Sequence, residues 1–249
     1  MVSIRSWKDV TPYVGHESAI IWSMFGEKGA KGLTDAEAPL EGILAFTFHM
    51  MQGTRSGDYH AHQEREQVYY FLRGKGTMKI DDQLYAVAEG DSLHIPARCR
   101  HQLINDSDDW IEHLIITAKA GQPEDGGRIT KRNWRDCTPV VAHESVIGWV
   151  IFKAKGTAGF PAEQTPLEGF LGMALQTMQA GRKTDYHAHE EREQVYYFTK
   201  GRGRMKLDGD VHEVKAGDAV HIPPQSKHQT INDSDDWLEH LILSAAVER

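Results

Sequence analysis

Short runs of apolar residues, each ended by a polar or glycine-containing turn, recur along the first half of the chain. They are rich in β-branched and aromatic residues, which favour strands. Few segments have the spacing of an amphipathic helix, so the pattern predicts an all-β fold of antiparallel sheets, either a sandwich or a barrel. The expected strands lie at 68–72, 77–81, 85–96 with a turn inside, 101–106 and 110–116.

The same pattern returns in the second half at a constant offset. His187 follows His60 by 127 positions, and Trp134 follows Trp7 by the same number, without a gap. The segment DYHAHQEREQVYYF at 58–71 returns as DYHAHEEREQVYYF at 185–198. A repeat of this length indicates a tandem duplication. The predicted organisation is one domain at 1–119, a linker at 120–131 and a second domain at 132–249.

Charge and composition narrow the range of partners. The 249 residues carry a formal net charge of −8, and Lys and Arg are scattered, so nucleic acid is not an expected partner. The first residues lack the pattern of a signal peptide, and no stretch approaches the roughly 20 apolar residues of a membrane helix. We therefore expect no membrane partner and a cytoplasmic location. Cys99 and Cys137 have no cysteine at the equivalent position of the other repeat, and we interpret them as ordinary thiols.

Histidines are the main chemical feature of the repeat. Of the 14 histidines, all except His49 and His212 are matched between the two copies. His60 and His62 are separated by one residue, and residues i and i+2 of a strand point to the same face. Such a pair can present two imidazoles to one metal ion, with nitrogens at about 2.0 to 2.1 Å. A second histidine-containing segment follows in each copy, GDSLHIPARCRHQLIND at 90–106 and GDAVHIPPQSKHQTIND at 217–233.

These two elements resemble the two motifs of the cupin superfamily. The second motif of that family runs Gly, five residues, Pro-x-Gly, two residues, His, three residues, Asn. The chain is similar to a bicupin, and the resemblance implies two tandem double-stranded β-helix (jelly-roll) barrels. In three places it departs from the family: Arg98 and Gln225 replace the internal glycine of the second motif, and Thr54 replaces the first glycine of the first motif. The residues that match the second motif are Gly90, Pro96, His101 and Asn105, and again Gly217, Pro223, His228 and Asn232.

The resemblance also implies a metal site in each barrel. In cupins, both histidines of the first motif and the histidine of the second bind a divalent metal. We expect Fe, Mn, Ni or Zn as the cofactor, with up to one ion in each domain. The implied histidine ligands are His60, His62 and His101 in the first domain and His187, His189 and His228 in the second.

The fourth ligand can be placed in two ways. Counting forward from His62 with three intervening residues gives Glu66, whereas counting back from Gly74 with six gives Gln67. We favour the backward count because it crosses an uninterrupted strand, whereas the polar QERE segment is expected to form a bend. The predicted fourth ligands are therefore Gln67 and Gln194, and the alternatives are Glu66 and Glu193.

This choice affects the expected chemistry. A neutral glutamine leaves the metal its full positive charge, which favours Lewis-acid polarisation of a carbonyl or enol group. We therefore expect an isomerase, tautomerase or lyase that acts on a small molecule. An Fe(II)-dependent dioxygenase is the first alternative, and a non-catalytic metal-binding or small-molecule-binding cupin is the second.

Two further histidines are candidates for proton transfer. His113 and His240 alternate with apolar residues, so they are either core residues or residues that line the barrel interior. A carboxylate of the first motif is the alternative group for moving protons. For the quaternary structure, a monomer with internal pseudo-symmetry and a homodimer both remain open. The predicted catalytic residues are Glu66, His113, Glu193 and His240.

Overall fold

The computed structural model describes residues 2–30, 32–120, 128–143 and 145–247. Its regular structure is β-strand except for three short 3-10 helices, which confirms the predicted all-β fold. Residues 121–127, which form most of the predicted linker, lie outside the described residues. The strands of the first repeat are β1 (Ser3–Ser6), β2 (Tyr13–Gly15), β3 (Ala19–Gly26), β4 (Ile43–Met51), β5 (Arg55–Ser56), β6 (Arg65–Arg73), β7 (Lys75–Ile80), β8 (Gln83–Ala88), β9 (Asp91–Ile95), β10 (His101–Asn105) and β11 (Ile111–Lys119), with η1 at Trp7–Asp9.

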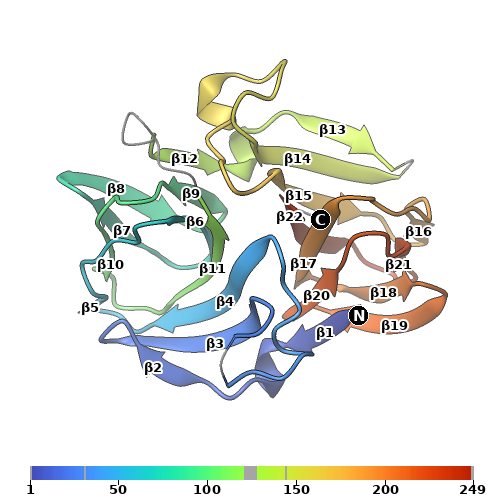
Figure 1. Cartoon of the computed structure of the whole chain (residues 1–249), viewed down its shortest axis with the longest axis horizontal. Helices are drawn as coiled ribbons and strands as arrows, with labels where there is room; N and C mark the ends of the chain where they lie inside the picture. The colour runs from blue at the N-terminus through green and yellow to red at the C-terminus, as the bar shows by residue number, and fades with distance from the viewer. Residues whose placement is uncertain (1, 31, 121–127, 144, 248–249) are drawn as a thin grey trace.

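The second repeat has the same strands in the same order and one additional 3-10 helix. Figure 1 shows the two halves side by side, the first in blue to green and the second in yellow to red. The second-repeat elements are β12 (Thr130–Asn133), β13 (Pro139–Ala142), β14 (Val146–Lys153), β15 (Gly172–Met178), β16 (Arg182–Lys183), β17 (Arg192–Lys200), β18 (Arg202–Leu207), β19 (Asp210–Lys215), β20 (Asp218–Ile222), β21 (His228–Asn232) and β22 (Leu238–Ala246), with η2 at Trp134–Asp136 and η3 at Ala162–Gln164.

The strands form two barrels, each made of a seven-stranded and a four-stranded antiparallel sheet. The N-terminal barrel has the orders β12-β9-β6-β11-β4-β3-β2 and β5-β10-β7-β8. The C-terminal barrel has the orders β1-β20-β17-β22-β15-β14-β13 and β16-β21-β18-β19. These are the two jelly-roll barrels that the resemblance implied. Among the described residues there is no helix of the length and apolarity that crossing a bilayer requires.

The first strand of each repeat lies in the sheet of the other repeat. β1 pairs antiparallel with β20, with Ser3 opposite His221. β12 pairs in the same way with β9, with Thr130 opposite His94. In Figure 1, β1 therefore lies beside the red strands of the second half, and β12 lies beside β9 of the first. The repeated sequences are continuous, but each barrel contains a strand from both.

A hydrophobic cluster joins the two barrels. Buried side chains from the large sheets of both belong to it, among them Phe46 and Tyr70 from one and Phe152 and Tyr197 from the other. The rings of Phe46 and Tyr197 are 5.9 Å apart. Each barrel interior has a separate apolar cluster of its own. The outer faces of the large sheets therefore form a third core between the barrels.

The three departures from the cupin motifs keep the backbone shape that glycine would allow. Arg98 has φ 70°, Gln225 has φ 69° and Thr54 has φ 60°, all in the left-handed region. A residue with a Cβ pays roughly 1 to 2 kcal/mol for this conformation. The turns are therefore retained at the cost of some strain, and the histidines that follow keep their places.

Candidate metal centres

Three histidines meet in the N-terminal barrel. Backbone hydrogen bonds run in both directions between His60 and His101, at 3.2 and 2.7 Å, and bring the two motifs together. The ring centres of His60 and His101 are 4.6 Å apart, and that of His62 lies 4.9 Å from His60 and 5.5 Å from His101. One ligand atom from each of the three lies within 4.8 Å of the other two. The structure thus gathers the three histidines that the motifs implied.

The C-terminal barrel repeats this arrangement. His187 and His228 exchange backbone hydrogen bonds at 3.2 and 2.7 Å. Their ring centres are 4.4 Å apart, and that of His189 lies 4.9 Å from His187 and 5.4 Å from His228. This trio also has its ligand atoms within 4.8 Å of one another.

Backbone carbonyl groups leave Nε2 as the free nitrogen of these rings. Nδ1 of His60 donates to the carbonyl oxygen of Asp58 at 3.2 Å, and Nδ1 of His101 to that of Cys99 at 3.0 Å. Within the described residues, Nε2 of His60, His62 and His101 is buried and has no hydrogen-bond partner. Unpartnered buried polar atoms are rare, and three of them gathered together fit a divalent metal ion.

The rings of the second centre are held in the same way. Nδ1 of His187 donates to the carbonyl oxygen of Asp185 at 3.2 Å, and Nδ1 of His228 to that of Ser226 at 3.1 Å. Nε2 of His187 and of His228 is buried without a partner in the described part of the chain. Such hydrogen bonds from the distal nitrogen fix the tautomer and the orientation of a metal-binding imidazole.

Burial favours the neutral form of four of the proposed ligand imidazoles. Desolvation lowers the pKa of His101 to about 3 and that of His62 to about 4. In the C-terminal barrel, desolvation lowers the pKa of His189 and of His228 to about 4. Neutral imidazole is the form that binds a metal ion, so these rings need not lose a proton first.

The side chain of Gln67 offers an oxygen for a fourth ligand. β6 begins at Arg65, so Glu66 and Gln67 are both strand residues and point to opposite faces. Nε2 of Gln67 donates to Oγ1 of Thr117 at 3.4 Å, and its Oε1 is buried without a partner among the described residues. The amide oxygen is therefore free to bind a cation.

Gln194 has the same surroundings in the C-terminal barrel. Its Nε2 donates to Oγ of Ser244 at 3.4 Å, and its Oε1 has no partner in the described ranges. It lines the same cavity as His187 and His189. We propose Gln67 and Gln194 as the fourth ligands on this support.

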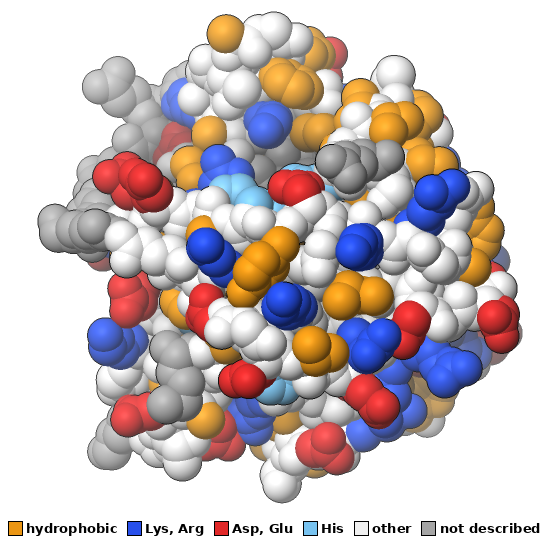
Figure 2. Space-filling model, turned by 90° about the vertical axis from the view of Figure 1, so that its right-hand side faces the viewer, with side chains coloured by type: hydrophobic (Ala, Val, Ile, Leu, Met, Phe, Trp, Pro, Cys, Tyr) orange, Lys and Arg blue, Asp and Glu red, His pale blue; other side chains and the backbone are white. Residues whose placement is uncertain are grey.

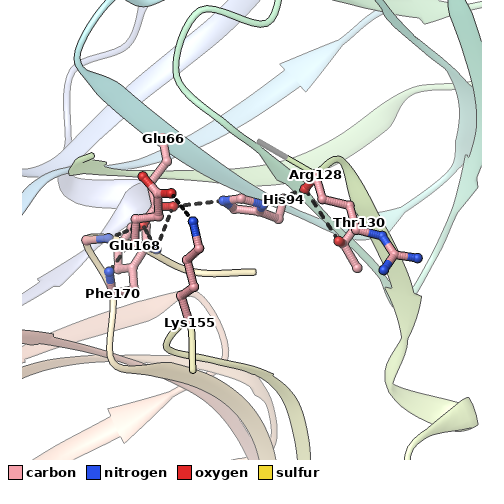
Figure 3. Close-up of polar contacts among 8 residues, drawn as sticks. Glu66, His94, Arg128, Thr130, Lys155, Glu168 and Phe170 are labelled. Carbon is pink, nitrogen blue, oxygen red and sulfur yellow. Dashed lines mark hydrogen bonds and ion pairs between the residues drawn. The ribbon is translucent and has the colours of Figure 1, made fainter. Parts of the chain in front are cut away.

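Glu66 lies at the contact between the two barrels. Its carboxylate is fully buried and accepts hydrogen bonds from the backbone N–H groups of Glu168, Gly169 and Phe170, the shortest being 2.6 Å from Gly169. Nε2 of His94 donates to it at 2.8 Å. Figure 3 shows the carboxylate pointing at the 168–170 turn, with the His94 ring directed at it from β9.

Glu193 makes the reciprocal contact. It accepts hydrogen bonds from the backbone N–H groups of Glu41 at 3.0 Å, Gly42 at 2.7 Å and Ile43, and His221 lies 3.2 Å away. Neither glutamate belongs to a histidine centre. Because both carboxylates are engaged at the contact between the barrels, we propose that they hold the barrels together, in place of the catalytic role expected from the sequence.

His16 and His143 lie over the proposed metal ligands. The sequence pattern did not predict this position for either histidine. The ring of His16 stacks on His60 at 4.9 Å, and that of His143 stacks on His187 at the same distance. Nδ1 of His143 donates to Asp185 at 2.6 Å. Both histidines have a left-handed backbone, with φ 47° and 48°, at the turn before β3 or β14. Their match between the repeats was the one signal that could have identified them.

His113 and His240 lie deeper in the barrels. The ring of His113 stacks on Tyr69 at 5.7 Å and that of His240 on Tyr196 at 5.1 Å, and each tyrosine also contacts the second-motif histidine. Burial lowers the pKa of each of these histidines to about 3. Nδ1 of both rings has no hydrogen-bond partner among the described residues. They are thus neutral side chains one aromatic layer away from the ligands.

The two centres differ in the space beside them. A cavity of about 210 Å³ adjoins His187 and His189, whereas the cavity beside His60 and His101 measures about 20 Å³. Figure 2 shows the outer side of the C-terminal barrel, where histidine side chains reach the surface next to acidic and basic ones.

The sequence of the chain matches a known family in both repeats. The model of the cupin domain matches residues 46–117 and 174–243. The chain therefore belongs to the cupin family and contains two tandem cupin domains, which confirms the resemblance seen in the motifs.

Curated relatives match part of the chain. An uncharacterised protein of Methanocaldococcus jannaschii is 42% identical over 60 residues, which cover 24% of this chain and 48% of that protein. Glucose-6-phosphate isomerase of Thermococcus litoralis is 33% identical over 100 residues, which cover 35% of this chain and 53% of that enzyme. The chain spans about half the length of these relatives.

Solved structures resemble the whole chain. A putative glyoxylate-induced protein from Pseudomonas aeruginosa has a TM-score of 0.77 at 15% identity, covering 100% of this chain and 88% of that one. Oxalate decarboxylase of Lactobacillus farciminis has a TM-score of 0.74 at 16% identity, covering 98% of this chain and 86% of that one. At such low identity the likeness shows the fold alone.

Proposed function

We propose that the protein is a metal-dependent enzyme that rearranges a small carbonyl or enol compound, as an isomerase, tautomerase or lyase. The observation that carries this proposal is a donor set of histidine nitrogens and one glutamine oxygen in each barrel. In the N-terminal barrel, the Nε2 atoms of all three histidines and the Oε1 atom of Gln67 have no other partner among the described residues, and in the C-terminal barrel the same holds for Nε2 of His187 and His228 and for Oε1 of Gln194. A divalent metal held by neutral ligands keeps its full charge and supplies Lewis acidity toward a substrate oxygen.

The chain supplies groups that can orient the substrate and move protons. His143 is held by Asp185 and lines the cavity beside the ligands, so its ring can donate or accept a hydrogen bond there. His113 and His240 are proposed for proton transfer, because each is a neutral ring with an unpartnered Nδ1 atom close to a metal centre. The partial match to glucose-6-phosphate isomerase supports an isomerisation in particular.

Metal analysis followed by reconstitution tests the proposal. The purified protein should contain a divalent metal, and His187→Ala with His189→Ala should remove one ion per chain. Exposed His212→Ala is the matched control and should leave the metal content unchanged. Protein reloaded with Ni, Zn, Mn or Fe would then be offered keto acids, uronates and sugar phosphates while carbonyl absorbance is followed.

The alternatives give different results in the same experiment. Oxygen uptake that requires Fe(II) would identify a dioxygenase and contradict Lewis-acid rearrangement. Metal removal that changes neither the melting temperature nor any turnover would identify a binding cupin. Turnover that proceeds with Zn and without oxygen would support the proposal, because Zn has no redox chemistry.

A further inference from the structure

The two barrels have equal ligand sets but unequal cavities. The N-terminal cavity, of about 20 Å³, has room for a single water molecule, which needs roughly 10 to 15 Å³. The C-terminal cavity, of about 210 Å³, is about ten times as large and has room for a small metabolite. Of these two cavities in the described part of the chain, the one beside the C-terminal centre is the one with space for a substrate.

Substitutions on two neighbouring strands account for the difference. In the N-terminal barrel, Oγ1 of Thr47 accepts a hydrogen bond from His49 at 2.8 Å and donates to the carbonyl oxygen of Ile115 at 3.0 Å. His49 is buried, and its ring packs at a tilt against His113 with 5.1 Å between the ring centres. This linked pair fills the interior. The equivalent residues of the C-terminal barrel are Ala174 and Gln176, and both line the larger cavity.

Two further positions show the same trend. Gly172 stands where the first repeat has Ala45, and Gly148 stands where it has Ile21. A Cβ atom at Gly148 would find nothing closer than Cγ of Gln176 at 3.8 Å, so the space is present and unfilled. Val150, in place of Ser23, is a larger side chain in the same wall. The net effect of these changes is to open the barrel.

The larger cavity also carries positive charge. Lys153 and Arg192 line it, and Lys153 has only Gly26 as its counterpart in the first repeat. Arg65, the counterpart of Arg192, lies 3.8 Å from Glu27, whereas the second repeat has Ala154 in place of that glutamate. No acidic residue in the described ranges forms an ion pair with Lys153 or Arg192.

Asp185, which contacts two histidines of the cavity lining, is already engaged. Asp185 accepts a hydrogen bond from His143 at 2.6 Å, and Nδ1 of His187 lies 3.1 Å from its other oxygen. The lining of the C-terminal cavity thus contains two cationic side chains and no acidic one. The lining of the N-terminal cavity contains Asp58 and no lysine or arginine.

We propose that the C-terminal barrel is the substrate-binding half and that its ligand is a small carbonyl compound with a carboxylate group, such as a keto acid. The inference rests on the proposed function for the role of the metal and goes beyond it in naming the site and the class of ligand. Lys153 and Arg192 bind the carboxylate, and the carbonyl oxygen faces the metal centre. The N-terminal barrel keeps a metal site that no substrate reaches.

Calorimetry on the zinc-loaded protein tests the proposal, with pyruvate as the probe and its neutral methyl ester as the comparison. We expect one equivalent of pyruvate to bind per chain. Lys153→Gly, which copies the first repeat, and Arg192→Gln should each raise the Kd of pyruvate about tenfold, the loss expected for one hydrogen bond to a charged group. The Kd of methyl pyruvate should change less than twofold.

Exchanging residues between the repeats tests the cavity itself. Ala174→Thr with Gln176→His should abolish pyruvate binding while the zinc content stays unchanged. The reverse exchange, Gly26→Lys with Thr47→Ala and His49→Gln, should add a second equivalent. The first group of substitutions fills one barrel and the second opens the other. If one variant protein fails to fold, the other still tests the proposal.

Several results would overturn the inference. Binding of two equivalents of pyruvate to the unmodified protein, or no binding at all, would contradict it. So would pyruvate binding that persists in Ala174→Thr with Gln176→His. An equal rise in the Kd of pyruvate and of methyl pyruvate in Lys153→Gly and Arg192→Gln would also contradict it. Binding without turnover of any compound would contradict the proposed function alone. Turnover that persists after the C-terminal cavity is filled would contradict this inference alone.

Discussion

Glu66 and Gln67 are neighbours in β6, and they face opposite ways because successive strand residues alternate between the two faces of a sheet. The glutamate side chain is thereby directed at the other barrel, and the glutamine, which we propose as a ligand, lies on the opposite face of the sheet. The same holds for Glu193 and Gln194 in β17. In each repeat, one Glu-Gln pair thus supplies a glutamate that contacts the other barrel and a glutamine for the proposed metal site.

Replacing the proposed glutamine ligand should change metal affinity in a predictable direction. Gln194→Ala should weaken binding at the C-terminal centre about tenfold or more, and Gln194→Glu should tighten it because a carboxylate adds charge attraction. Competition with a chelator measures both effects. Gln179→Glu places the same charge at an exposed position and serves as the control. Equal affinities in all four proteins would show that Gln194 is not a ligand.

The buried histidines His113 and His240 should link stability to pH. Their pKa values are lowered by burial to about 3, whereas a histidine in the unfolded chain titrates near 6.5. Between these values the unfolded chain binds more protons, so their contribution is fully present above about pH 6.5 and is lost as the pH falls. Between pH 6.5 and 5, each ring should lower the free energy of unfolding by about 2 kcal/mol.

Urea unfolding of the metal-free protein at pH 7 and pH 5 measures this dependence. His113→Gln with His240→Gln should flatten it, and exposed His212→Gln should leave it as it is. An unchanged pH dependence in the double variant would mean that other groups are responsible.

Single residues also mark the limit of what the sequence could predict. The proposed ligand histidines follow from the motif spacing that the cupin resemblance supplied. The expected strand over His60 and His62 is absent, because both lie in the segment between β5 and β6, where His60 forms an isolated bridge with His101. His16 could not be placed, since a left-handed turn and not a strand directs its ring over His60. The role of Glu66 could not be predicted either, because its partners lie in a turn about a hundred positions further along the chain.

At the scale of the elements, the PLEG turns at 39–42 and 166–169 donate backbone hydrogen bonds to the two buried glutamates, Glu193 and Glu66. The glycine of each turn is required by the close approach of the barrels. A Cβ atom at Gly42 would collide with the carbonyl oxygen of Ala246, and one at Gly169 with that of Lys119. The repeated PLEG sequence is therefore explained by contact between the barrels.

Removing the charge of one of these glutamates should destabilise the whole protein. Glu66→Gln places an amide where three backbone N–H groups and His94 all point, so it loses charge-assisted hydrogen bonds in a buried site. We expect a loss of roughly 2 to 4 kcal/mol, measured by urea unfolding. Glu64→Gln removes an exposed charge two residues away and is the control. A loss no larger than that of the control would rule out the proposed role.

On the scale of the whole molecule, the barrels share two strands and a core. β1 and β12 each complete the sheet of the opposite repeat, and the shared core contains residues of both. The sequence predicted two barrels, but it could not show this exchange. Short strands such as SIRS and TKRN have the same pattern whichever sheet they join.

Dividing the chain should therefore not yield two independent domains. We expect fragments 1–124 and 125–249 to purify as a one-to-one complex when produced together. Each alone should lack a cooperative unfolding transition, because it is without an edge strand and exposes the shared core. Circular dichroism and thermal melting of the separate and combined fragments measure this. Cooperative melting of either fragment alone would contradict the expectation.

The exchange of β1 and β12 also affects how the stability of the fold depends on protein concentration. A protein made of one repeat would have to take its missing strand from a second molecule, so its folding would weaken as the solution became more dilute. Here both repeats belong to one chain, so each repeat meets the other at an effective concentration in the millimolar range. Duplication has thus turned an association between molecules into a step within one molecule, and neither repeat can be lost without leaving the other incomplete.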